Sequence, residues 1–231
     1  VVLMPEKSTV KEYTVPAFVK SICGYAFSKC LSLETVNIPA GVTEIGDYAF
    51  FSAVSLAKIG LPSTLKNIGT LALYNTKFYS SITDEFAVVG DGLLIKYTPK
   101  REGGALVKTE HATPVSSGGF NGVSLTLPDG IRSVSGAFAY CLDVFSVKLS
   151  SDVTEIASAA FANATYLEEV DFSGASVSYI GDMAFYSTAM LKSVALPESL
   201  KSGGKGGFHS SGIESVVIPS SLETGGEDMF A

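Results

Sequence analysis

The sequence has no tryptophan, and it has only two histidines and three cysteines among 231 residues. Neither His111 nor His209 has a cysteine, serine or carboxylate at the spacing of a zinc site or a catalytic triad. An odd number of cysteines without a CxxC pair argues against a disulfide framework and against a cysteine-based metal site. We therefore expect no catalytic residue, no metal ion and no cofactor.

Charge and long apolar runs are also scarce. Charged residues make up 17% of the chain, with 16 Lys and Arg against 23 Asp and Glu, a net charge of −7. The absence of a basic block excludes nucleic acid as the expected partner. No apolar run approaches the roughly 20 residues that span a bilayer, so we expect no membrane insertion. The chain begins with Val1, so we expect a mature form or a fragment, in which a missing signal peptide says little about origin.

The sequence is rich in one repeated phrase. VTEIGDYAF at 42–50 and VTEIASAAF at 153–161 agree at six of nine positions. Further copies follow at steps of 22 to 24 residues within two blocks of the chain. The anchor at the end of the phrase is Phe27, Phe50, Leu73, Phe138, Phe161, Phe185, Phe208 and Phe230. A period of this size indicates a solenoid, in which each coil buries its apolar face only against its neighbours.

Each copy divides into a strand and a turn. The segment Leu-x-x-Val-x-Ile alternates apolar and other residues, which predicts one β-strand per coil and a parallel sheet along one face. The segment Ile-Gly-x-x-Ala-Phe is expected to turn back across the other face as short irregular or helical structure. Pro39, Pro62, Pro197 and Pro219 follow the strand, where a missing N–H does least harm to the ladder.

These segments resemble a known family. LETVNIPAGVTEIGDYAF (33–50) and LKSVALPESLKS (191–202) are similar to the BspA-like, Treponema-type leucine-rich repeats. That family's unit reads L-x-x-I-x-I-P-x-x-V-x-x-I-x-x-x-A-F-x-x-C, and the resemblance covers about residues 15–76 and 112–231. It implies a leucine-rich-repeat solenoid that is extracellular or on the cell surface, with adhesion to host matrix or cells as its function. Because a fold does not fix a function, no binding residue is transferred from the family.

The repeats predict four segments. Residues 1–14 form an N-terminal cap or lead-in, 15–76 a first repeat block, 77–111 an insertion, and 112–231 a second block that stops in mid-unit. Within the insertion, two apolar strands flank Gly90-Asp91-Gly92 in FAVVGDGLLIKY (86–97), which predicts a β-hairpin. The insertion is either a binding face or a brace between the blocks.

Three copies have glycine where the repeat has isoleucine, at Gly118, Gly203 and Gly225. Loss of a buried isoleucine side chain costs about 2–5 kcal/mol per site. Either the neighbouring coils repack to compensate, or the recorded sequence is wrong at these positions.

The outward residues of the predicted sheet form the candidate ligand-binding face. They include Thr35, Asn37, Lys58, Lys148, Glu169 and Asp171. Glu169 and Asp171 share one face of a strand and could hold calcium or act as a hydrolytic pair, but a solvated acidic patch with a Lys148–Asp171 cross-strand pair is the simpler interpretation. The face has few aromatic or arginine anchors, so a weak or multivalent contact fits better than a tight one.

Aromatic residues also occur on the turns, at Phe51, Tyr140, Tyr166 and Tyr186. They are either exposed contacts for a partner or side chains that pack at the coil edges.

The function that these observations favour is a non-enzymatic interaction protein, expected to be monomeric, whose partner is a host or cell-surface protein. The alternative is a structural spacer that presents another domain and binds nothing itself. A hydrolase built on a solenoid has no supporting residue constellation.

Overall fold

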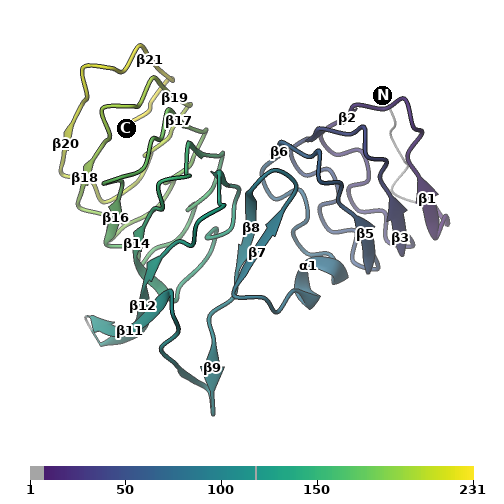
Figure 1. The fold of residues 1–231 in the computed structure, drawn as a ribbon, viewed down its shortest axis with the longest axis horizontal. Helices are drawn as coiled ribbons and strands as arrows, with labels where there is room; N and C mark the ends of the chain where they lie inside the picture. The colour runs from purple at the N-terminus through teal and green to yellow at the C-terminus, as the bar shows by residue number, and fades with distance from the viewer. Residues whose placement is uncertain (1–7, 118) are drawn as a thin grey trace. The chain divides into compact units, whose positions relative to one another are not determined.

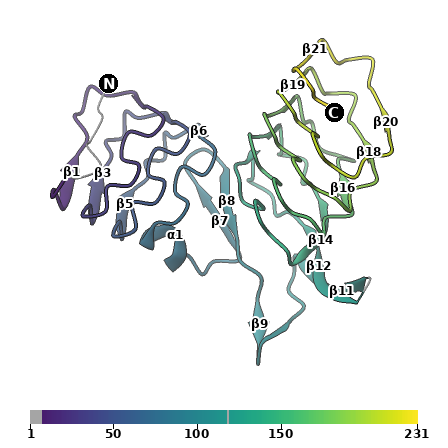
Figure 2. The ribbon, with the colours of Figure 1, turned by 180° about the vertical axis from the view of Figure 1, so that it is seen from behind.

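The computed structural model describes residues 8–117 and 119–231, which form two compact units with their boundary between Leu93 and Leu94. Both units are stacks of short coils, as Figures 1 and 2 show from opposite sides. The boundary falls inside the segment that the sequence marks as an insertion. Residues 1–7 of the predicted N-terminal segment lie outside the described residues.

The first unit carries two parallel sheets, one on each side of the coils (Figure 1). The front sheet consists of β1 (Glu12–Thr14), β3 (Thr35–Asn37) and β5 (Lys58–Gly60), and the back sheet of β2 (Ser21–Ile22), β4 (Glu44–Ile45) and β6 (Asn67–Ile68). Tyr13, Val36 and Ile59 occupy one register position, which confirms the predicted parallel strands. A short helix, α1 (Lys77–Ser81), and strand β7 (Phe86–Val89) follow. The Thr76 hydroxyl caps α1 by accepting a hydrogen bond from the Tyr79 N–H.

The second unit repeats this arrangement, except that its first front strand pairs antiparallel with the second. Its front strands are β11 (Ala112–Ser117), β12 (Phe120–Thr126), β14 (Val144–Lys148), β16 (Glu169–Asp171), β18 (Ser193–Ala195) and β20 (Ser215–Val217). Its back strands are β13 (Ser133–Val134), β15 (Glu155–Ile156), β17 (Tyr179–Ile180), β19 (Ser202–Gly203) and β21 (Thr224–Gly225). The strand order of the back sheet within this unit is β21-β19-β17-β15-β13-β8, with β8 spanning Leu93–Tyr97. The predicted solenoid is therefore confirmed, and the turn segment adds a second parallel sheet.

The predicted insertion contributes to the core of the second unit. Strand β8 lies beside β13, and the Leu94 carbonyl accepts a hydrogen bond of 2.8 Å from the Ser135 N–H. Leu94, Ile95 and Tyr97 of β8 are buried. By contrast, β9 (Arg101–Glu102) and β10 (Ala105–Leu106) form an antiparallel pair on the surface. Part of the insertion thus replaces a coil strand.

A stack of phenylalanine rings runs through the coils of each unit. Phe27 and Phe50 lie 5.0 Å apart between ring centroids in the first unit, with planes 3° from parallel. In the second unit Phe161 lies 4.9 Å from Phe138 and 5.0 Å from Phe185, again nearly parallel. All of these rings are fully buried. Each ring is covered on both faces only because the coils above and below supply the next ring.

Residues in the left-handed backbone region flank each stacked phenylalanine. Around Phe27 they are Tyr25 (φ 60°) and Lys29 (φ 54°), and around Phe161 they are Ala159 (φ 55°) and Asn163 (φ 60°). This conformation lets the intervening N–H groups point along the solenoid axis. The Phe161 N–H donates to the Ala184 carbonyl of the next coil at 2.8 Å. Most of these residues are not glycine, so coil-to-coil hydrogen bonds offset a conformational cost of roughly 1–2 kcal/mol per residue.

Met229 explains one of the three glycines that replace isoleucine, Gly203. Gly203 and Gly225 occupy the register position of Ile180. A Cβ atom at Gly203 would overlap the Cε and Sδ atoms of Met229, a residue that is 5% exposed. Met229 itself stands where other coils have alanine, at Ala26, Ala49, Ala72, Ala137, Ala160 and Ala184. The long, flexible thioether thus fills the volume of the isoleucine side chain that is missing at Gly203. Gly225 is exposed, and a Cβ atom there would only be in ordinary contact with Met229. Gly118 lies outside the described residues.

Phe161→Ala is expected to lower the free energy of unfolding by about 3–5 kcal/mol, because it opens a cavity between two stacked rings. Urea denaturation followed by circular dichroism measures this change. Phe18→Ala is the control, because Phe18 is 82% exposed and its removal should change stability little. A cost below about 1 kcal/mol for Phe161→Ala would contradict the stacking.

Met229→Ala is expected to cost about 2–5 kcal/mol, the range for a large core side chain. Gly203→Ile alone should also destabilise the protein, because the new side chain meets Met229. The double variant Gly203→Ile/Met229→Ala should recover part of the loss. Unfolding of all three variants forms a double-mutant cycle, and strictly additive losses would show that Met229 does not fill this volume.

Candidate functional site

The candidate face in the first unit is a row of polar side chains on β1, β3 and β5. Thr35 pairs in register with Lys58, and Asn37 pairs with Thr14. The Asn37 Nδ2 donates to Glu12 Oε1 at 3.0 Å and to Thr14 Oγ1 at 3.3 Å. These hydrogen bonds hold the Asn37 amide against the preceding strand, while Lys58 remains exposed. The structure thus brings Thr35, Asn37 and Lys58 together on one surface.

The candidate face in the second unit lies on β14 and β16. Lys148 pairs in register with Asp171, and Lys148 Nζ lies 3.6 Å from Asp171 Oδ2, which confirms the predicted cross-strand pair. The Ser173 N–H donates to Asp171 Oδ1 at 2.7 Å. Hydrogen bonding to Ser173, with a smaller contribution from the Lys148 charge, holds the pKa of Asp171 below its ordinary value. Glu169 is exposed at the other end of β16.

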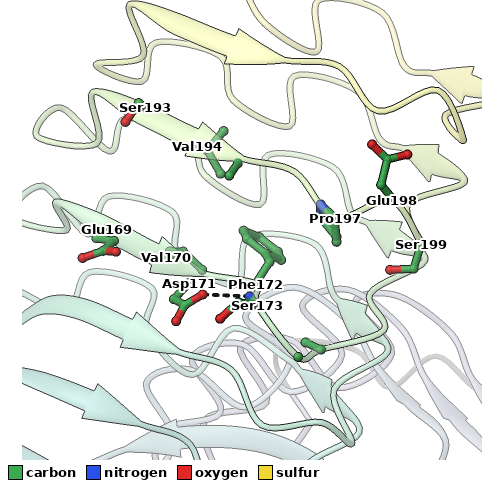
Figure 3. A pocket seen from close by; sticks show the side chains of 13 residues that line it. Glu169, Val170, Asp171, Phe172, Ser173, Ser193, Val194, Pro197, Glu198 and Ser199 are labelled. Carbon is green, nitrogen blue, oxygen red and sulfur yellow. Dashed lines mark hydrogen bonds between the residues drawn. The ribbon is translucent and has the colours of Figure 1, made fainter.

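A hollow of about 570 Å³ adjoins this face at the C-terminal ends of β16 and β18 (Figure 3). Its lining includes Glu169 and Asp171 of β16 and Ser193 of β18, together with Glu198 and Ser199 of the following loop. It forms because the loop after β16 carries one extra residue. Five residues lie between Asp171 and Val177, whereas four lie between Lys148 and Val153 and between Ala195 and Leu200. Gly174, at φ +87°, lies in the longer loop.

The sequence prediction missed Ser173, Glu198 and Ser199 as parts of this hollow. They lie outside the strands, and the prediction considered only strand positions. The available signal was the 24-residue step from Val153 to Val177, the longest step in the second block. An extra residue in a repeat marks a local change in the stack.

Aromatic residues on the turns pack mainly against one another. Tyr25 stacks on Tyr48 at 5.1 Å between ring centroids, with planes 10° from parallel, and Phe51 stacks on Tyr74 at 6.0 Å. In the second unit Tyr186 stacks on His209 at 5.8 Å. Because ring faces cover one another, these residues offer mostly edges to the solvent. The arrangement favours packing at the coil edges.

Ion pairs join consecutive coils with a fixed polarity. A basic residue in one coil meets an acidic residue 22 or 23 positions later. The pairs are Lys11–Glu34, Arg132–Glu155, Lys148–Asp171, Lys192–Glu214, Lys201–Glu223 and Lys205–Glu227, at 2.7 to 3.6 Å. Most are exposed, so each contributes under about 1 kcal/mol to stability.

Cysteines and metal-ligating residues do not form a reactive cluster in the described part of the chain. Cys23, Cys30 and Cys141 are not joined in disulfides, and burial raises the pKa of Cys141 to about 11. Among residues 8–117 and 119–231, no three His, Cys, Asp or Glu side chains gather as a metal site would require. The same residues contain no helix long and apolar enough to cross a membrane.

Comparison with known proteins identifies the family. The BspA type leucine rich repeat region matches residues 6–88 and 118–231 in six copies, and the chain belongs to this family. A leucine rich cell surface protein from Faecalibacterium prausnitzii A2-165 is similar at 26% identity and a TM-score of 0.51, over 92% of this chain and 55% of that chain. The resemblance seen in the sequence is therefore confirmed.

The pneumococcal vaccine antigen PcpA is similar in fold, with 20% identity and a TM-score of 0.50 over 95% of this chain and 55% of that chain. This chain therefore spans 55% of the length of each of these two proteins. A search of curated protein sequences found no match.

Asp171→Asn is expected to lower the unfolding free energy at pH 7 by under about 1 kcal/mol, because the pair is partly exposed. The folded-state pKa of Asp171 is depressed, so its stabilisation is present above the unfolded value near 3.9. It is lost as the pH falls through the folded pKa. Urea denaturation of both proteins at pH 7 and pH 2.5 should show a smaller difference at pH 2.5 than at pH 7. Glu169→Gln is the control on the same strand, and an Asp171→Asn difference that is as large at pH 2.5 as at pH 7 would contradict this assignment.

Proposed function

We propose that this chain is a non-enzymatic protein-binding module of a secreted or cell-surface protein. It acts as a monomer and adheres to a host or cell-surface protein, such as a matrix component. Membership of the BspA-type family supports this proposal, as does the similarity to a leucine rich cell surface protein.

The observation that carries the proposal is the polar row on the front strands of each unit. The core uses alternate strand residues, such as Val147 and Val170, which are buried. The residues between them, such as Lys148 and Glu169, are exposed and are not needed for packing. The strand ladder fixes their spacing at roughly 4.8 Å per coil. A surface that is already ordered binds with little loss of conformational entropy.

The chemistry of the row predicts modest affinity for a single site. Tight protein interfaces depend on buried aromatic and arginine anchors, and Thr35, Asn37, Lys58, Lys148, Glu169 and Asp171 include none. Charged rim residues mainly affect association rate and salt dependence. We therefore expect binding that weakens with salt and that gains strength when several copies are presented on one surface.

The test is surface-based binding of the purified chain to a panel of matrix proteins, plasma proteins and whole cells, at low and physiological salt. We expect saturable binding to one protein partner. The charge-reversal variant Lys148→Glu/Glu169→Lys should weaken that binding about tenfold or more while the chain stays folded, with only the small loss of stability that follows from breaking the Lys148–Asp171 pair. Glu44→Lys, on the back strand β4, is the matched control and should bind as the original chain does.

Two results would contradict the proposal. The first is that folded protein binds no member of the panel, which would favour the alternative of a structural spacer that presents another domain. The second is binding that neither the Lys148→Glu/Glu169→Lys variant nor the Glu44→Lys variant changes, which would place the contact outside the front strands.

A further inference from the structure

The front ladder of the second unit is interrupted between β16 and β18. Strand β16 ends a four-stranded sheet, and β18 starts a separate two-stranded sheet with β20. In the first unit the corresponding front strands, β1, β3 and β5, form one continuous ladder. The interruption coincides with the extra residue in the loop that contains Gly174.

Alternation along the strands shows which backbone groups line the break. The Asp171 carbonyl accepts a hydrogen bond from the Leu149 N–H at 3.0 Å. The backbone N–H and C=O groups of Asp171 therefore point toward β14, and those of Val170 point toward β18. The Lys192 carbonyl accepts a hydrogen bond from the Glu214 N–H at 2.9 Å. The carbonyl of Lys192 therefore points toward β20, and the backbone N–H and C=O groups of Ser193 point toward β16. The backbone hydrogen-bonding groups of Val170 and Ser193 therefore face one another across the break, where β16 and β18 are not paired as strands of one sheet. Open strand edges are ready hydrogen-bonding surfaces for another chain.

The break is too narrow for an inserted strand. Residues of β16 and β18 approach to within 8 Å between Cα atoms, whereas an intervening strand would need roughly 9.6 Å, twice the ladder spacing. The hollow of about 570 Å³ can instead accept side chains from a segment that lies along its mouth.

The lining of the hollow is acidic. Figure 3 shows Glu169 and Asp171 on β16 and Glu198 beyond Pro197, and no lysine, arginine or histidine is among the lining residues. Lys148 partly neutralises Asp171, and the Ser220 hydroxyl donates to Glu198 Oε2 at 3.4 Å. Glu169 lies on β16, whereas Glu198 lies in the turn that follows β18 and Pro197. Two carboxylates thus stand at different points along the hollow.

We propose that this hollow binds an extended segment of a partner protein through arginine side chains that pair with Glu169 and Glu198. This inference rests on the proposed protein-binding function. Arginine suits the site better than lysine, because its planar guanidinium can donate at once to a carboxylate and to an exposed edge carbonyl and is weakly hydrated. A segment with an arginine near each end can engage both glutamates, because Glu169 and Glu198 line different parts of the hollow.

The test uses the hexapeptide Arg-Ser-Gly-Ser-Gly-Arg, blocked at both ends, and the same peptide with citrulline in place of arginine. Titration of the whole ¹⁵N-labelled chain should give saturable amide shifts that centre on Val170, Ser193 and Ala195. The Glu169→Gln/Glu198→Gln variant should bind the arginine peptide at least tenfold more weakly. Glu223→Gln, an exposed acid outside the hollow, is the matched control and should bind normally.

A second variant tests the shape of the site. Deleting Gly174 restores the four-residue loop of the other coils, and it should join β16 to β18 and abolish peptide binding. Equal binding of the citrulline peptide, or shifts of the same amides by calcium chloride at lower concentration than by the peptide, would overturn the inference. A partner protein that binds the original chain and the double glutamine variant equally would also overturn it, while leaving the proposed function intact.

Discussion

Contact between successive coils is the interaction on which the whole structure depends. A single coil cannot bury its phenylalanine, because each ring face is covered by the ring of a neighbouring coil, as Phe161 is by Phe138 and Phe185. The same neighbours accept the N–H groups that the left-handed turn residues direct along the axis. Hydrophobic burial and backbone hydrogen bonding therefore have the same geometric requirement, a repeat of constant height. The fixed polarity of the coil-to-coil ion pairs is consistent with that register.

Constancy of the repeat also explains where the molecule departs from regularity. One added residue after Asp171 leaves the back ladder intact, since β15, β17 and β19 remain paired, but it separates β16 from β18 on the front. The coil absorbs the extra length in its exposed loop, where a glycine can adopt a positive φ. The irregularity that this added residue causes is thus confined to the front surface, which is the surface where we place binding.

The sequence predicted the parts of the fold that a single coil determines. The front strands, the phenylalanine positions and the Lys148–Asp171 pair follow from strand alternation and a 23-residue offset. The back strands, such as Glu44–Ile45, were missed because two residues are too few to show a period. The burial of Ile95 in β8 was missed because that strand lies outside the repeat. The packing of Met229 and the hollow beside Glu198 depend on residues from adjacent coils, which no single copy reveals.

The packing of Met229 against Gly203 makes these two coils different from the others. Most coils carry isoleucine and alanine at the two positions concerned, so one such coil could in principle replace another. The two most C-terminal coils instead carry Gly203 and Gly207 in one and Gly225 and Met229 in the other, and the Met229 side chain occupies the space that a Cβ at Gly203 would need. A regular coil in place of the first would clash with Met229, and a regular coil in place of the second would leave the space beside Gly203 unfilled. These two coils therefore fit together as a pair, and neither can be exchanged for a regular coil by itself.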